Sequence, residues 1–158
     1  YDNQEDYQNE GTINRNETAA TNSNRNWDFR LFDAVQSGDV REAQNALNHH
    51  ADIQFRLVNN MNLLHLACKN KNVRMAEFLI KQNIEVNAQN NDGLTPLMVA
   101  VFYQQYDICK LLLEHGADPN IADVDGVVPL DIAFFQKQED ISKLLISHGA
   151  KSEKFSSD

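Results

Sequence analysis

From Trp27 onward the chain repeats itself without a gap, with a period of about 33 residues. Matching positions hold the same or similar residues in four successive units: Ala34, Ala67, Ala100 and Ala133; Leu31, Leu64, Leu97 and Leu130; Leu47, Ile80, Leu113 and Ile146. A period of this length is typical of a solenoid, in which each small unit buries its apolar face against its neighbours. The 158 residues therefore predict a stack of four units, not one globule around a single core.

Residues 90–122 show the local structure that one unit encodes. Residues 90–93 are typical of a turn in which Gly93 adopts a positive φ, and Thr95-Pro96 favours the start of a helix. Three apolar residues of a second helix are spaced i, i+3 and i+4: Ile108, Leu111 and Leu112. Gly116 is expected to end that helix in a left-handed conformation. Each unit is thus predicted to be turn, helix, turn, helix.

The motifs of this unit resemble the ankyrin repeat. They are Asp92-Gly93-Leu94-Thr95-Pro96-Leu97 and Leu111-Leu112-Leu113-Glu114-His115-Gly116-Ala117-Asp118-Pro119-Asn120. The resemblance covers residues 27–151 and implies an all-α solenoid of stacked helix-turn-helix units, with β-hairpin finger loops and a concave binding face. The predicted units are 27–56, 57–89, 90–122 and 123–151.

The helix openings depart from the family pattern of threonine, proline, leucine and histidine. They read Asn62-Leu63-Leu64-His65, Thr95-Pro96-Leu97-Met98 and Val128-Pro129-Leu130-Asp131. Because no unit keeps both the threonine and the histidine, we expect an incomplete hydrogen-bond network between units. Asn60 replaces the turn glycine of the second unit, and asparagine is the residue that next best tolerates this backbone shape.

The two ends of the array differ in character. Residues 1–26 are rich in asparagine and acids, and we predict a flexible arm that is a linker or, less favoured, a partner-binding segment. Residues 27–56 are predicted to be an N-terminal cap, because Asp33, Glu42 and Asn45 replace apolar residues of the second unit. At the other end, either residues 151–158 fold back with Phe155 as a lid, or more repeats follow. We favour a true end, with 152–158 as a tail.

The sequence offers little catalytic or metal-binding chemistry. His49, His115 and His148 share one repeat position and are predicted to cap helix C-termini, too far apart to share a metal. Cys68 and Cys109 are predicted to be small buried residues. Residues 123–126 begin like a calcium loop but lack its remaining ligands. Without a known catalytic motif, we expect no cofactor, no metal site and no enzymatic activity.

Charge narrows the possible partners. Fourteen Lys and Arg against 23 Asp and Glu give a formal net charge of −9, which disfavours binding to nucleic acid or anionic membranes. The longest apolar run, residues 97–103, is too short to span a bilayer. We therefore expect a protein partner with a partly basic surface, a chain that is monomeric by itself, and a cytoplasmic or nuclear location.

The candidate partner-binding residues share one property, which is that they lie at finger tips or at the solvent-facing end of a first helix. They are Met61, Lys69, Asn70, Asn91, Asp92, Leu94, Phe102, Tyr103, Asp125, Val127, Phe135 and Gln136. Phe102 and Phe135 are one repeat period apart, so we expect them side by side on the concave face, where exposed aromatic residues often dominate binding energy. The alternative is that both pack under the fingers or between units.

The leading hypothesis is a non-catalytic protein-interaction module. Two alternatives remain open. Residues 125–133 are similar to the terminal repeats that follow the catalytic domain of some Arf GTPase-activating proteins, which would make this chain the regulatory segment of a larger enzyme. The size of four repeats also fits a free-standing inhibitor of a protein kinase.

Overall fold

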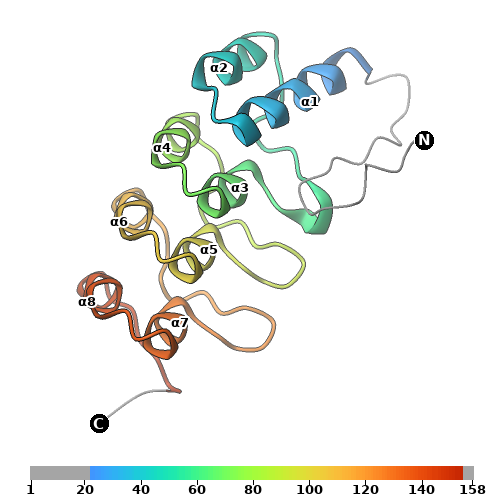
Figure 1. The fold of residues 1–158 in the computed structure, drawn as a ribbon. Helices are drawn as coiled ribbons and strands as arrows, with labels where there is room; N and C mark the ends of the chain where they lie inside the picture. Colours follow the sequence, from blue (N-terminus) through green and yellow to red (C-terminus); the bar gives the residue numbers. More distant parts are fainter. Residues whose placement is uncertain (1–21, 155–158) are drawn as a thin grey trace.

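The computed structural model describes residues 22–154, with side chains from residue 25 onward, and all regular elements in this range are helical. In chain order they are α1 (Asn22–Ser37), α2 (Val40–Asn48), the 3₁₀ turn η3 (Val58–Asn60), α3 (Leu63–Lys69), α4 (Val73–Lys81), α5 (Pro96–Phe102), α6 (Tyr106–Glu114), α7 (Pro129–Phe135) and α8 (Glu139–Ser147). The helices form four antiparallel pairs that stack into a solenoid (Figure 1). The predicted turn, helix, turn, helix unit is therefore confirmed.

The core lies between successive pairs. First helices α1, α3, α5 and α7 pack in one row, and second helices α2, α4, α6 and α8 pack in another, while the loops between units project to one side (Figure 1). The repeated leucine and alanine positions are buried in every unit: Leu31, Leu64, Leu97 and Leu130; Ala34, Ala67, Ala100 and Ala133. Small alanines at the shared position let neighbouring first helices approach closely, which explains why this residue recurs.

Left-handed residues recur with the same period as the helices. Residues 60, 93 and 126 have φ of 60°, 82° and 79°, and residues 50, 83, 116 and 149 have φ of 74°, 64°, 96° and 89°. Asn60 thus takes the backbone shape of Gly93 and Gly126, as the sequence predicts. His50 and Asn83 take the shape of Gly116 and Gly149. A side chain at Gly93 would meet the Val124 backbone nitrogen at 2.8 Å, so glycine is required here for close approach as well.

Each finger is a hairpin loop closed by a backbone hydrogen bond. The amide of residue 57, 90 or 123 donates to the carbonyl of residue 61, 94 or 127, over distances of 2.7, 3.0 and 2.9 Å. Neighbouring fingers are also joined, because the Asn91 amide donates to the Asn59 carbonyl and the Val124 amide donates to the Asp92 carbonyl. The fingers of units two to four therefore form one continuous ledge beside the first helices.

The first helix corrects the predicted start of the folded region. α1 begins at Asn22, five residues before the boundary expected at Trp27, because residues 22–26 contain no proline or glycine to stop a helix from extending past its first apolar residue. The rest of the predicted flexible arm, residues 1–21, lies outside the described residues, as does the proposed lid residue Phe155.

Candidate functional site

A groove of about 280 Å³ opens between the finger ledge and the first helices of units two to four. We call it the concave groove. Its lining comes from two fingers, from α3 and α5, and from α7: Asn59, Met61, Lys69, Asn90, Asp92, Leu94, Met98, Val99, Phe102, Tyr103 and Ile132.

The floor of the concave groove is apolar and its helical edge is aromatic. Met98 and Val99 are buried on α5, so they contribute a fixed apolar surface. Phe102 is 55% exposed at the end of the same helix, and its ring meets the Tyr103 ring edge-on at 5.1 Å between centroids. Tyr103 is partly buried against the core, so Phe102 is the member of the pair that offers exposed aromatic area to another protein.

The finger edge of the groove is polar and acidic. Asp92 is exposed at the tip of its finger, where one carboxylate oxygen accepts a hydrogen bond of 3.2 Å from the Asn59 side-chain amide. Asp125 occupies the corresponding place on the next finger and is also exposed. Asp92 therefore places a carboxylate at the finger edge of the groove, opposite its aromatic edge, and Lys69 places one cation in the same lining.

The structure brings together half of the predicted site residues. Those that line the groove are Met61, Lys69, Asp92, Leu94, Phe102 and Tyr103, and those that lie outside its lining are Asn70, Asn91, Asp125, Val127, Phe135 and Gln136. Met61 is a correction, because it was expected at an exposed finger tip and is only 7% exposed. The hairpin turns it inward, and its sulfur lies 3.5 Å from the Asn90 side-chain nitrogen.

The two predicted aromatic residues are exposed rather than packed beneath the fingers. Phe135 is 79% exposed at the end of α7, and the Gln136 side chain donates to the Phe102 carbonyl over 3.2 Å. The sequence missed Met98, Val99 and Ile132, because apolar helix positions of this spacing were assigned to the contacts between units. It also missed Asn90, which was assigned to the turn of residues 90–93. The run of consecutive apolar residues 97–101 was the one available signal that this helix has two apolar faces.

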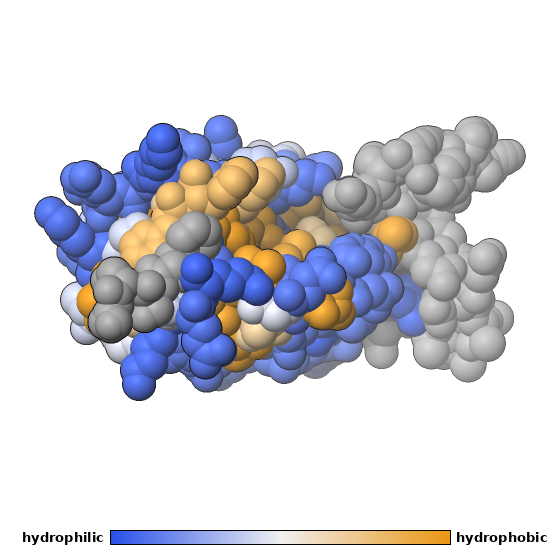
Figure 2. Space-filling model, turned by 90° about the horizontal axis from the view of Figure 1, so that it is seen from below, coloured by the Kyte–Doolittle hydropathy of each residue, from blue (hydrophilic) through white to orange (hydrophobic). Residues whose placement is uncertain are grey.

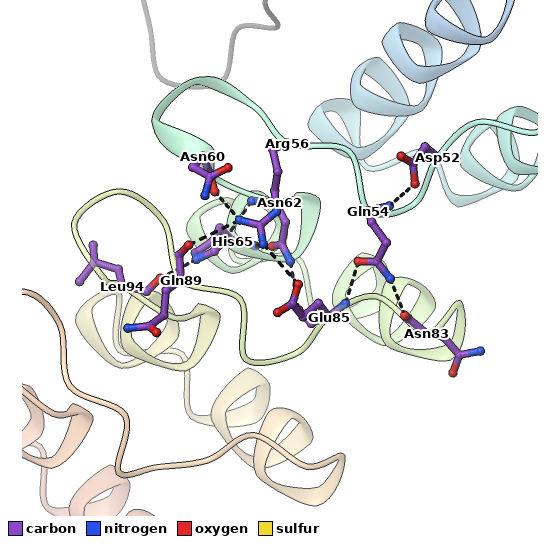
Figure 3. A network of polar contacts seen from close by, with 10 residues as sticks. All are labelled: Asp52, Gln54, Arg56, Asn60, Asn62, His65, Asn83, Glu85, Gln89 and Leu94. Carbon is purple, nitrogen blue, oxygen red and sulfur yellow. Dashed lines mark hydrogen bonds and ion pairs between the residues drawn. The ribbon is translucent and has the colours of Figure 1, made fainter.

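A polar network fastens the second unit to the third beside the groove (Figure 3). His65 Nδ1 accepts a hydrogen bond of 3.0 Å from the Asn62 amide, and His65 Nε2 donates to the Leu94 carbonyl over 2.8 Å. The Asn62 side-chain oxygen in turn accepts from the His65 amide, which completes a capping box. Asn62 thus caps the helix in place of the threonine of the family pattern. The expectation of an incomplete hydrogen-bond network is wrong for this unit.

The arrangement of His65 requires a neutral ring. One ring nitrogen accepts and the other donates, and a protonated imidazole could only donate. Burial lowers the pKa of His65 to about 4, with the nearby Arg56 acting in the same direction. Arg56 itself bridges loops, because it donates to the Asn60 carbonyl and pairs with Glu85 at 3.3 Å (Figure 3).

The third and fourth units each keep half of this capping arrangement. Thr95 accepts a hydrogen bond from the Met98 amide, but Met98 has no polar group to return it. In the last unit Asp131 accepts from the Val128 amide, and Val128 offers no side-chain acceptor. For these two units the expectation of an incomplete network is confirmed.

The remaining polar candidates have structural roles. The Nδ1 atoms of His49, His115 and His148 lie 2.9, 2.9 and 3.1 Å from the carbonyl oxygen four residues earlier, so these residues cap helices as predicted. Cys68 and Cys109 are buried free thiols, and burial raises the pKa of both. Asp123 accepts from the amides of the turn it begins. Among residues 22–154, no three His, Cys, Asp or Glu side chains are grouped to hold a metal.

The fold and the groove together define the class of protein, a solenoid of helix-pair repeats. Residues 31–123 match the family described as ankyrin repeats (3 copies), so the chain belongs to the ankyrin repeat family. A curated protein named putative ankyrin repeat protein L371, from Acanthamoeba polyphaga mimivirus, is 36% identical over 77 residues, which are 49% of this chain and 10% of that protein. The chain therefore spans about a tenth of the length of this relative.

Membership of the family sets the general role. Ankyrin repeats are a non-catalytic fold that generally serves in protein–protein interaction. No helix in the described part of the chain combines the length and the apolar character needed to cross a membrane.

Proposed function

We propose that this chain binds a partner protein through the concave groove and the finger ledge beside it. The observation that carries the proposal is the exposed ring of Phe102, braced edge-on by the partly buried Tyr103, above an apolar floor. A phenylalanine ring left half exposed beside a groove adds little to the stability of the folded chain. A partner that fills the hollow would bury the ring of Phe102.

The exposed acids of two neighbouring finger tips support a partner with a partly basic surface. Asp92 and Asp125 stand one repeat period apart on neighbouring fingers, and the whole chain has a formal net charge of −9. A lysine or arginine facing the Asp92 carboxylate would add a charge-assisted hydrogen bond and speed the encounter. No catalytic step is proposed for the chain.

The proposed location is the cytoplasm or the nucleus. A reducing compartment of this kind is supported by the free thiols of Cys68 and Cys109.

The test is affinity capture from the native cell, with the captured proteins quantified by mass spectrometry. Phe102→Ser, alone and with Phe135→Ser, should lose a partner that the unchanged chain retains, while the thermal melting point stays within a few degrees because both rings are exposed. Val73→Ser is the matched control, since Val73 is 40% exposed at the start of α4, outside the groove lining.

Two outcomes would contradict the proposal. If the Phe102→Ser chain captures the same proteins in the same amounts, the groove is not the binding site. If binding and melting temperature fall together, the aromatic residues stabilise the fold and the loss of binding is indirect.

A further inference from the structure

The first helices of the four units end in a row of equivalent residues beside the concave groove. The row takes one residue from each unit, 33 positions apart: Gln36, Lys69, Phe102 and Phe135. Phe102 is 55% exposed although helix pairs pack on both sides of its unit, so this repeat position faces away from the contacts between units. Phe135 occupies the same position one unit later and is 79% exposed. The row is thus polar over units one and two and aromatic over units three and four.

An aliphatic row accompanies the aromatic one. Three residues earlier on the same helices stand Leu66, Val99 and Ile132, and residues three apart share one face of a helix. Val99 is buried and Ile132 is partly buried, and both line the concave groove. Seen from the α7–α8 end, apolar side chains form a band across the middle of the face, with hydrophilic ones on both sides of it (Figure 2). Units three and four therefore each present one exposed ring next to an aliphatic side chain.

The finger tips add an acidic row on the other edge of the groove. Asn59, Asp92 and Asp125 are equivalent residues of three successive fingers, and both acids are exposed. The Val124 amide donates to the Asp92 carbonyl over 3.1 Å, which holds the two acidic fingers in a fixed register. The acids belong to units three and four, the same units that carry the exposed rings. The surface therefore offers the same pair, one ring and one carboxylate, twice and one repeat apart.

The distance between units selects the conformation of a segment that can use both pairs. Packed helices lie about 8–10 Å apart. In an α-helix, residues i and i+7 point to the same side and lie ~10.5 Å apart, close to this spacing. In a β-strand, the side chains of one face recur at roughly 6.6 Å and 13 Å, on either side of it.

A polyproline II segment is the nearest alternative, because its side chains recur every ~9.3 Å on one side. Such a segment places no side chain over the surface between two anchors. An α-helix places those of residues i+3 and i+4 there, where Ile132 and the edge of Tyr103 lie between the two rings in the repeat. An α-helix therefore covers more of the apolar surface.

We propose that the partner presents an amphipathic α-helix, laid across units three and four. Two large apolar residues of that helix, seven positions apart, pack on Phe102 and Phe135. Lysines or arginines at the same spacing, on the flank that faces the fingers, pair with Asp92 and Asp125. This inference rests on the proposed function, because it names the kind of segment that the concave groove and the adjoining ring of Phe135 bind.

Selection from a display library of random peptides tests the inference, with peptides long enough for five helical turns (~18 residues). The full chain is the target, and peptides that also bind the Phe102→Ser chain are removed. The remaining peptides should share two large apolar residues seven positions apart, with a lysine or arginine beside each. The Val73→Ser chain is the matched control and should retain these peptides, because Val73 lies on α4, outside the groove lining.

The outcomes separate this inference from the proposed function. If no peptide is enriched, or if every enriched peptide binds the Phe102→Ser chain equally well, the groove is not a binding site and both fail. If the enriched peptides depend on Phe102 but share alternating apolar residues, or prolines three apart, the groove binds a partner segment and only the helix is wrong.

Charge reversal tests the basic flank of an enriched peptide, with binding measured by fluorescence anisotropy at low salt. Asp92→Lys with Asp125→Lys should weaken binding about tenfold or more, and changing the basic residues of the peptide to glutamate should restore it. Glu77→Lys with Glu114→Lys is the matched control, because these exposed acids give the same change in net charge on α4 and α6. If both pairs of substitutions change the affinity equally, the finger acids do not face the peptide and the inference is overturned.

A proline placed midway between the two apolar residues of the peptide tests the helix itself. Proline inside an α-helix removes a hydrogen bond and clashes with the preceding turn, so binding should be lost. A peptide that tolerates this proline binds in an extended or polyproline II conformation, which overturns the inference.

Discussion

Replacing Gly93 by alanine tests whether the fingers are held together as one ledge. Gly93 has a φ of 82°, and a Cβ atom here would lie 2.8 Å from the Val124 nitrogen and 2.9 Å from the Asp123 Cα. The positive φ costs an alanine about 1 kcal/mol. The overlap is with backbone atoms, which cannot rotate away as a side chain can, so displacing the next finger adds roughly 1–3 kcal/mol. We expect Gly93→Ala to lower the free energy of unfolding by about 2–4 kcal/mol.

Gly126 provides a matched control one period later. Its φ is 79°, and nothing lies within 4 Å of the Cβ position. Gly126→Ala should therefore cost only the conformational part, about 1 kcal/mol. Urea denaturation followed by far-UV circular dichroism at room temperature measures both variants against the unchanged chain. If the two substitutions shift the midpoint equally, the contact between fingers contributes nothing and the ledge described above is not a stabilising feature.

Three further changes probe the units separately. Burial lowers the pKa of His65 from 6.5 to about 4, so the imidazole of the unfolded chain is protonated first as the pH falls. The free energy of unfolding should therefore drop by at most roughly 3 kcal/mol between pH 6.5 and pH 4. His65→Gln should remove this part of the pH dependence from a series of urea midpoints. Gln104→Gly relieves a non-glycine φ of 60° and should stabilise the chain by about 1 kcal/mol in the same assay. Asn120→Ala removes hydrogen bonds to the Gly149 carbonyl and the Lys151 amide, so hydrogen exchange should quicken in α8 before it quickens in α4.

Each of these has an outcome that would contradict it. A His65→Gln chain with an unchanged slope between pH 4 and pH 6.5 would mean that other groups control this range. A destabilised Gln104→Gly chain would show that flexibility gained by the unfolded chain outweighs the relieved strain. Uniform exchange in α4 and α8 of Asn120→Ala would mean that the last unit opens only with the whole array.

The arrangement of the helices could be predicted from the sequence because the repeat is a packing requirement. A helix pair that cannot bury its own apolar face needs a neighbour with matching residues, and the fixed register of leucines and alanines records that need. The left-handed turn position of Asn60 was equally readable, since units three and four have glycine there. The left-handed residues between paired helices, Lys71, Gln104 and Lys137, were not predicted. These features depend on residues close in the chain or on one fixed spacing.

The groove was harder to predict, because it depends on how the fingers fold over the helices. Met61 looks like an exposed loop residue in the sequence, but its hairpin turns it against Asn90 of the next unit. Asn62 replaces threonine in the capping box, a substitution whose effect is visible only once its side chain is placed beside His65. Both depend on contacts between side chains in three dimensions, which the local pattern does not encode.

Hydrogen exchange measured by mass spectrometry shows whether a bound partner occupies the concave groove. The chain is compared with and without a partner obtained by affinity capture. With the partner bound, exchange should slow in the fingers at residues 57–62 and 90–95 and around the end of α5, and should stay unchanged in α4 and α6. Protection confined to α4, α6 and α8, on the opposite side of the units from the fingers, would contradict it.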